Sequence, residues 1–185
     1  TATQGIGISD FDADGNQDIF LSQNFFAHLV ERPRDDAGRG LLIIGNGDGT
    51  FKSMTGQESG IKVYGEQRAV GVSDFNNDSR SDIVVTQNGS KTVLYQNRAG
   101  KQGIAINLNY SSANPNAIGA KLQFVYDDGQ AGAIQEIKMG EGYLSQNSST
   151  QIMGYKKYPK SLVIIWPDGS RDNITLPSGL LTINV

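Results

Sequence analysis

The sequence predicts an all-β protein, and three observations lead to that prediction. The first is an internal repeat without gaps, in which residues 5–24 (GIGISDFDADGNQDIFLSQN) and residues 69–88 (AVGVSDFNNDSRSDIVVTQN) align at an offset of 64. The second is a turn-rich composition, with 23 glycines and only 37% hydrophobic residues, which is typical of many short strands. The third is a series of alternating polar and apolar segments after residue 100, several of which are joined by Asp-Gly turns.

The repeat region is predicted to cover residues 1–99 and to consist of short antiparallel strands. Each copy reads as an apolar strand, an Asp-rich loop and a second apolar strand. Residues 41–55 (LLIIGNGDGTFKSMT) predict a hairpin, because a Gly-Asp-Gly turn separates two strand-like runs. Residues 92–96 (TVLYQ) predict one more strand. Residues 25–40 predict a long loop with at most one turn of helix, which Pro33 would end.

A second all-β unit is predicted over residues 100–185, where the repeat stops. Residues 97–103 (NRAGKQG) have the composition of a linker. The strands expected after it are residues 104–110, 120–126, 133–139, 161–166, 171–176 and 180–185. Short alternating strands with Asp-Gly turns between them predict a small β-sandwich or barrel.

The composition excludes several classes of partner and of site. The net charge is −3 and the isoelectric point is near 5.1, so the chain lacks the basic surface that binds nucleic acid. No apolar run approaches the roughly 18 residues of a membrane span, so we expect no membrane insertion. The chain has no cysteine and a single histidine, His28, which excludes disulfides, zinc–thiolate centres and sites built from several histidines. A metal site in this chain can therefore contain no thiolate and at most one imidazole ligand.

The first Asp-rich loop has the spacing of a calcium site. Oxygen-bearing residues occupy its alternate positions 1, 3, 5, 7 and 9, namely Asp10, Asp12, Asp14, Asn16 and Asp18. Calcium takes about six to eight hard oxygen ligands, and alternate positions of a tight loop converge on one centre. Gly15 permits a sharp turn, and Asn16 would supply its backbone carbonyl. The alternative is a solvated Asp-rich turn without an ion, which the mutual repulsion of the four carboxylates disfavours.

The second Asp-rich loop repeats this pattern with fewer charges. Its predicted ligands are Asp74, Asn76, Asp78, Arg80 through its backbone carbonyl, and Asp82. Three carboxylates replace the four of the first loop, and Ser79 stands where the first loop has its turn glycine. We therefore predict weaker calcium binding at the second loop. The alternative is a relic loop that holds no ion.

These loops resemble the FG-GAP/VCBS repeats, the calcium-loop blades of integrin-like β-propellers. The resemblance covers residues 5–99 and includes the Gly-Asp-Gly-Thr-Phe segment at residues 47–51. The remainder resembles the ASPIC/UnbV domain in three segments, residues 114–120, 142–147 and 166–169. Two departures from the family patterns are Asn76 with Ser79 in the second loop, and residues 154–156 (GYK) where the ASPIC/UnbV domain often has Gly-Leu-Gly.

The resemblance implies partial β-propeller blades, bound Ca²⁺ and an extracellular, periplasmic or cell-surface location. We expect a recognition or adhesion module that is not an enzyme and whose ligand is an unidentified protein or glycan. Catalysis is not expected because Glu136 and Glu141 show no paired-acid signature, and the other notable carboxylates belong to the loops. The alternative is an accessory domain of a polysaccharide-acting enzyme or of a transport system.

The number of repeats bears on how the blades are completed. A propeller needs roughly four or more blades to close, and this chain carries one full repeat and most of another. We therefore expect the C-terminal part of a longer secreted protein. The alternative is that open blade edges pair with a partner or with the C-terminal unit.

Overall fold

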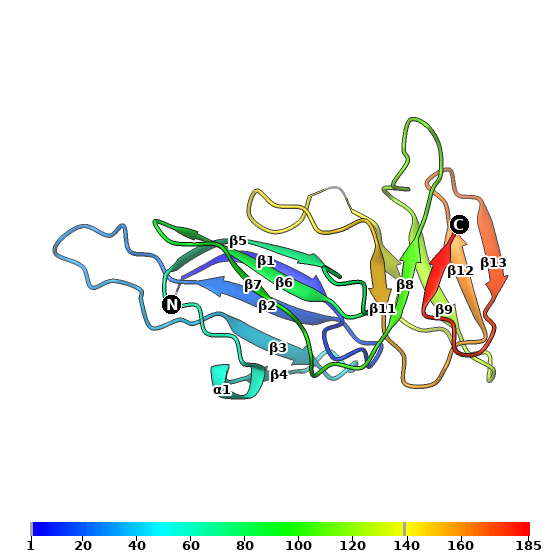
Figure 1. The fold of residues 1–185 in the computed structure, drawn as a ribbon, viewed down its shortest axis with the longest axis horizontal. Helices are drawn as coiled ribbons and strands as arrows, with labels where there is room; N and C mark the ends of the chain where they lie inside the picture. The colour runs from blue at the N-terminus through cyan, green and yellow to red at the C-terminus, as the bar shows by residue number, and fades with distance from the viewer. Residues whose placement is uncertain (1, 139) are drawn as a thin grey trace.

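The computed structural model describes residues 2–138 and 140–185, and it confirms that the protein is all-β. Strands hold 39% of the residues and helix holds 2%, and none of the sheets closes on itself. Figure 1 shows two units side by side, with the repeat region at the left and the C-terminal unit at the right. Each unit contains two sheets. The division between residues 99 and 100 itself stays a prediction.

The first blade is a four-stranded antiparallel sheet in the order β1-β2-β3-β4. Its strands are β1 (Thr3–Ser9), β2 (Asp18–Gln23), β3 (Leu41–Gly45) and β4 (Phe51–Met54). Successive side chains of a strand point to opposite faces. Phe20 and Leu42 are register partners and are buried on one face, whereas Ile19 and Leu21 are half-buried on the other. Both faces of this blade are therefore apolar.

The second blade is a three-stranded antiparallel sheet that packs on the first. Its strands are β5 (Glu66–Ser73), β6 (Asp82–Asn88) and β7 (Val93–Tyr95). The blades share one apolar cluster, made of Phe11, Phe20, Leu42, Ile61, Val63, Val70, Val72, Ile83 and Val85. Gly7 permits the close approach of β5 to β1, because a Cβ atom on Gly7 would lie 2.6 Å from Cγ1 of Val70.

Four positions that are equivalent in the sequence repeat are buried in the second blade but exposed or half-buried in the first. Four side chains of the second blade belong to the shared cluster and are at most 7% exposed, namely Val70, Val72, Ile83 and Val85. Their counterparts at the offset of 64 are exposed or half-buried, namely Ile6, Ile8, Ile19 and Leu21. We call these four counterparts the outer face of the first blade.

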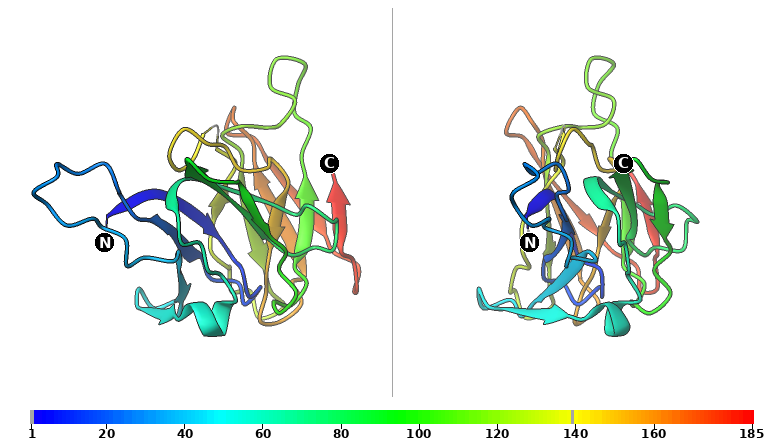
Figure 2. Two further views of the ribbon diagram at one scale, coloured as in Figure 1. Left: turned by 60° about the vertical axis from the view of Figure 1, so that its left-hand side comes forward. Right: turned by 90° about the vertical axis from the view of Figure 1, so that its left-hand side faces the viewer.

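The C-terminal unit is a β-sandwich of two sheets, seen from two further sides in Figure 2. Its larger sheet has the order β10-β9-β12-β13 and its smaller sheet the order β11-β8-β14, with β14 parallel to β8. The strands are β8 (Ile104–Asn107), β9 (Lys121–Val125), β10 (Gln135–Glu136), β11 (Gln151–Met153), β12 (Ser161–Ile165), β13 (Arg171–Thr175) and β14 (Thr182–Asn184). Both sheets contribute to one core, in which Ile104, Leu122 and Leu162 have no exposed surface.

A segment of the C-terminal unit covers the edge of the second blade at β5. The Val72 N–H donates to Asn147 Oδ1 at 2.8 Å, and the Ser148 N–H donates to the Val72 carbonyl at 2.9 Å. Asn147 Nδ2 donates in turn to Glu141 Oε2 at 2.6 Å, which holds the Asn147 side chain in place. In Figure 1 this segment is the yellow loop that reaches over β5. At β5 the edge is therefore covered from within the same chain.

Two observed elements were not expected from the sequence. Helix α1 (Gly56–Ser59) begins after a capping box formed by Thr55 and Glu58, a signal that the sequence does contain as T-x-x-E. Strand β11 has only three residues, which is too short for a periodic pattern to show.

Several expected elements are shorter or simpler in the structure, such as the strand expected over residues 104–110, which ends at Asn107. The strand expected over residues 133–139 is reduced to the two residues of β10, and residue 139 lies outside the described residues. The long loop over residues 25–40 is present without any helical residue, and an isolated bridge joins Phe25 to Asp35. Within the described residues, no helix has the length or the apolar character needed to cross a membrane.

Candidate metal centre

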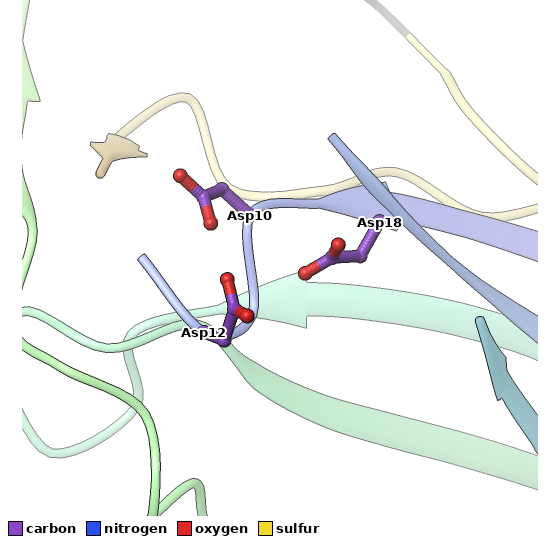
Figure 3. Close-up of side chains that lie close together, drawn as sticks. All are labelled: Asp10, Asp12 and Asp18. Atoms are coloured by element: carbon purple, nitrogen blue, oxygen red, sulfur yellow. The ribbon is translucent and has the colours of Figure 1, made fainter. Parts of the chain in front are cut away.

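The first Asp-rich loop brings three carboxylates together between β1 and β2. Asp10, Asp12 and Asp18 each offer an oxygen, and these oxygens lie within 4.8 Å of one another. Figure 3 shows the three side chains turned towards a common space. Asp10 and Asp18 are 2% and 0% exposed, and Asp12 is half-buried. The loop therefore concentrates negative charge in a nearly closed site.

Backbone amides fold the loop around its first carboxylate. Asp10 Oδ1 accepts the Asp14 N–H at 3.0 Å, and Asp10 Oδ2 accepts the Gly15 N–H at 2.8 Å. Ala13 and Gly15 adopt positive φ angles of 56° and 92°, which turn these amides inward. The glycine at the predicted turn position thus has the backbone conformation for which the sequence suggested it.

Asp18 closes the loop and ties it to the rest of the blade. Its Oδ2 accepts the Phe11 N–H at 2.8 Å, and its Oδ1 accepts the Gly45 N–H at 2.9 Å. Phe11 follows Asp10 in the loop, whereas Gly45 ends β3. The carboxylate of Asp18 therefore joins three parts of the first blade. Sequence reasoning did not identify Gly45, although it stands in the Gly-Asn-Gly segment of the predicted hairpin.

Burial makes the ionised form of these carboxylates unfavourable in the absence of a cation. Loss of hydration raises the pKa of Asp10 from 3.8 to about 7, and the charge of Asp18 adds to the rise. Loss of hydration likewise raises the pKa of Asp18 to about 6, with a further contribution from the charge of Asp12. A bound divalent cation would oppose both effects. The donor set fits calcium in chemistry, because it consists of hard, anionic oxygens.

Two predicted ligands of the first loop lie outside this cluster. Asp14 Oδ1 accepts the Asn16 N–H at 2.8 Å, and Asp14 Oδ2 accepts Asn16 Nδ2 at the same distance. Lys156 Nζ of the C-terminal unit lies 3.7 Å from Asp14 Oδ2. Asp14 and Asn16 thus bind to each other, and their roles as metal ligands stay predictions.

The second loop repeats the hydrogen bonds within the first loop at the offset of 64, whereas the outside donor to its last carboxylate is a different residue. Asp74 accepts the N–H groups of Asp78 and Ser79 at 3.0 and 2.8 Å. Asp82 accepts the Phe75 N–H at 2.9 Å and the Asn97 N–H at 2.7 Å. Ser79 adopts a φ of 61°, the left-handed conformation that costs a serine more than a glycine.

The second loop differs from the first in its charge arrangement. Asn76 stands where the first loop has Asp12, and its Nδ2 donates to Asp78 Oδ2 at 2.9 Å. The Arg80 guanidinium lies 3.2 Å from the same oxygen. Within the described residues, the carboxylates of this loop do not form a three-oxygen cluster like that of the first. Calcium binding by Asp74, Asn76, Asp78, Arg80 and Asp82 stays a prediction.

A groove of about 560 Å³ lies between the outer face of the first blade and the C-terminal unit. Ile8, Ile19 and Phe51 line it on the side of the first blade. Charged residues line it on the other side, namely Lys121, Glu136, Lys138 and Glu141. The groove therefore combines an apolar wall with a wall of mixed charge.

Comparison with known protein families agrees with a repeat region followed by a separate C-terminal unit. No curated protein matches the sequence. Residues 10–85, which include both Asp-rich loops, match the FG-GAP-like repeat family. Residues 110–184, which include most of the sandwich, match the ASPIC and UnbV family. The chain therefore matches an FG-GAP-like repeat followed by an ASPIC and UnbV domain, in the order that the sequence predicted.

Proposed function

We propose that the chain is a calcium-binding recognition or adhesion module that acts outside the cytoplasm and has no catalytic activity of its own. The observation that carries this proposal is the cluster of Asp10, Asp12 and Asp18 in the first loop. FG-GAP-like repeats often bind Ca²⁺ and are typically extracellular, which supports both the ion and the location.

The proposed role of calcium is to hold the blade together at its loop end. Asp18 already joins the loop to β3 through hydrogen bonds, and an ion shared with Asp10 and Asp12 would add a second tie. Extracellular calcium modules commonly bind with dissociation constants of about 10⁻⁴–10⁻³ M. At about 1 mM calcium such a site adds about 0.4–1.4 kcal/mol to the free energy of unfolding.

Calorimetric titration with CaCl₂ tests this proposal directly. We expect a tighter site at the first loop and a weaker one at the second. Asp12→Asn should weaken the tighter site to about the affinity of the second loop, because it removes one of the three clustered carboxylates and places an asparagine where the second loop has Asn76. Asp36→Asn makes the same charge change on the exposed 25–40 loop and should leave both sites intact. A wild-type chain that binds no calcium at millimolar concentration, or unchanged binding in Asp12→Asn, would contradict the proposal.

One observation favours the alternative of an accessory domain for polysaccharides. Glu136 and Glu141 line the 560 Å³ groove together with Lys121 and Lys138, so charged groups that can bind sugar hydroxyls face one space.

Arrays of glycans and of extracellular proteins, probed with and without EGTA, separate the two functions. If the chain is a recognition module, it should bind an arrayed glycan or protein only when calcium is present, and Asp12→Asn should weaken that binding. Calcium-independent retention on polysaccharides alone, lost in Glu141→Gln, would support the accessory role instead. Glu58→Gln provides a control with the same charge change on α1, away from the groove.

A further inference from the structure

Three consecutive backbone carbonyls of the first loop are bound by groups from outside that loop. The donor–acceptor pairs are Asn97 Nδ2 with the Phe11 carbonyl at 2.7 Å, the Lys101 N–H with the Asp12 carbonyl at 3.3 Å, and the Tyr155 N–H with the Ala13 carbonyl at 3.2 Å. Asn97 and Lys101 lie in the linker, and Tyr155 lies two residues after the end of β11. The backbone around Asp12 is therefore fixed by distant parts of the chain.

Gly154 places the C-terminal unit in direct contact with the carboxylate cluster. A Cβ atom at residue 154 would overlap Asp10 Oδ2 and the backbone of Ala13. The φ of Gly154 lies outside the left-handed region, so the glycine is needed for space and not for its conformation. The Ala13 backbone cannot turn aside as the end of a flexible side chain can. A side chain at this position would therefore push on the turn that delivers the Asp14 and Gly15 amides to Asp10.

We propose that residues 153–156 of the C-terminal unit form part of the first-loop calcium site, as the wall that holds Asp10 and Ala13 in the binding shape. This inference rests on the proposed binding of calcium by the first loop. Gly154 acts here as a positioning residue, because it shapes the loop and supplies no ligand. The affinity of the loop for calcium then depends on how the C-terminal unit is docked, and calcium in turn strengthens that docking, since coupling between two binding equilibria is reciprocal.

Lys156 in the same wall should act in the opposite direction. Its Nζ lies 3.7 Å from Asp14 Oδ2, and its side chain is 66% exposed. The ammonium group places a positive charge beside the loop, and this charge repels a calcium ion bound there. Because the pair is exposed, the effect is small, and Lys156→Gln should tighten calcium binding about twofold.

The test compares three variants of the full chain by calorimetric titration with CaCl₂. Gly154→Ala should weaken binding at the first loop by about tenfold or more, the size of effect seen when groups that orient metal ligands are disturbed. Lys156→Gln should tighten it. Gly132→Ala is the control, because it adds a methyl group to the same unit where the nearest atom lies 3.4 Å away and no left-handed φ is involved. Thermal melts in EGTA establish that each variant is folded.

Amide hydrogen exchange gives a second measurement that does not depend on the variants. Calcium should slow exchange at the Tyr155 and Lys101 N–H groups of the wild-type chain, because these groups donate to the first loop. The Gly132 N–H, which donates to the Phe124 carbonyl, should exchange at the same rate with and without calcium.

The outcomes separate this inference from the proposed function. A wild-type chain without calcium binding overturns both. Normal wild-type binding with an unchanged affinity in folded Gly154→Ala overturns only the role of residues 153–156. If Gly154→Ala does not fold, an unchanged affinity in Lys156→Gln together with calcium-independent exchange at Tyr155 overturns that role.

Discussion

Asp18→Ala is expected to lower the free energy of unfolding by about 2–5 kcal/mol in saturating calcium. The Asp18 carboxylate is fully buried and accepts two backbone N–H groups, from Phe11 and Gly45. Alanine would leave both donors without a partner, and each buried unpaired group costs about 1–3 kcal/mol. Calcium binding at the first loop should be lost as well. Urea unfolding in saturating calcium measures the first effect, and calorimetry measures the second.

Asp48→Ala is the matched control for this prediction. The Asp48 carboxylate also accepts two hydrogen bonds, from the N–H and the hydroxyl of Thr50, but it lies in an exposed turn where water can replace it. Its removal should cost less than about 1 kcal/mol. Equal costs for the two variants would show that Asp18 does not hold the blade together in the manner described.

Phe20→Ala is expected to lower the free energy of unfolding by about 3–5 kcal/mol. The Phe20 ring is fully buried in the cluster shared by the two blades, and a Cβ atom on Gly40 would lie 2.7 Å from it. Removal of the ring would leave a cavity between the sheets of the two blades, and the sheets would not close it fully by moving together. Because a domain of this kind has about 5–15 kcal/mol in total, a large part of the stability would be lost. Urea unfolding in saturating calcium is the appropriate measurement.

Phe75→Ala tests whether burial is the cause of that loss. Phe75 lies in the second loop and is 68% exposed, whereas its repeat counterpart Phe11 is 6% exposed. Truncation of Phe75 should change stability by no more than about 0.5 kcal/mol. A comparable loss in Phe20→Ala and Phe75→Ala would be incompatible with the shared core described for the two blades.

The features predicted correctly from the sequence are those with a local cause. The first loop could be predicted because alternating oxygens and Gly15 stand within nine residues between two apolar strands. The all-β class followed from the same strand–loop–strand pattern and from the Asp-Gly turns of the C-terminal unit. In each case the residues that determine the structure are neighbours in the chain.

The contacts that complete the site have no local cause. The Gly45 N–H reaches Asp18 across 27 positions, and Gly154 meets Asp10 from the other unit. A glycine that is needed for space looks the same in the sequence as a glycine in a turn. The pairing of Asn147 with Val72 is likewise a contact between units, and its geometry depends on how they pack.

The symmetry of the contact between the blades follows from the repeat. The outer face of the first blade is equivalent in sequence to the face of the second blade that carries Val70, Val72, Ile83 and Val85. The contact between the blades joins two different faces, so it is heterologous, and within the described residues no further blade packs on the outer face of the first blade. A further blade, added by the same rotation and translation, would cover this face and would expose an equivalent face of its own. Blades joined in this way either return to their starting point as a ring or continue as an open helix. Closure is therefore determined by the angle between neighbouring blades and by their number, and the apolar chemistry of the faces is the same in both cases.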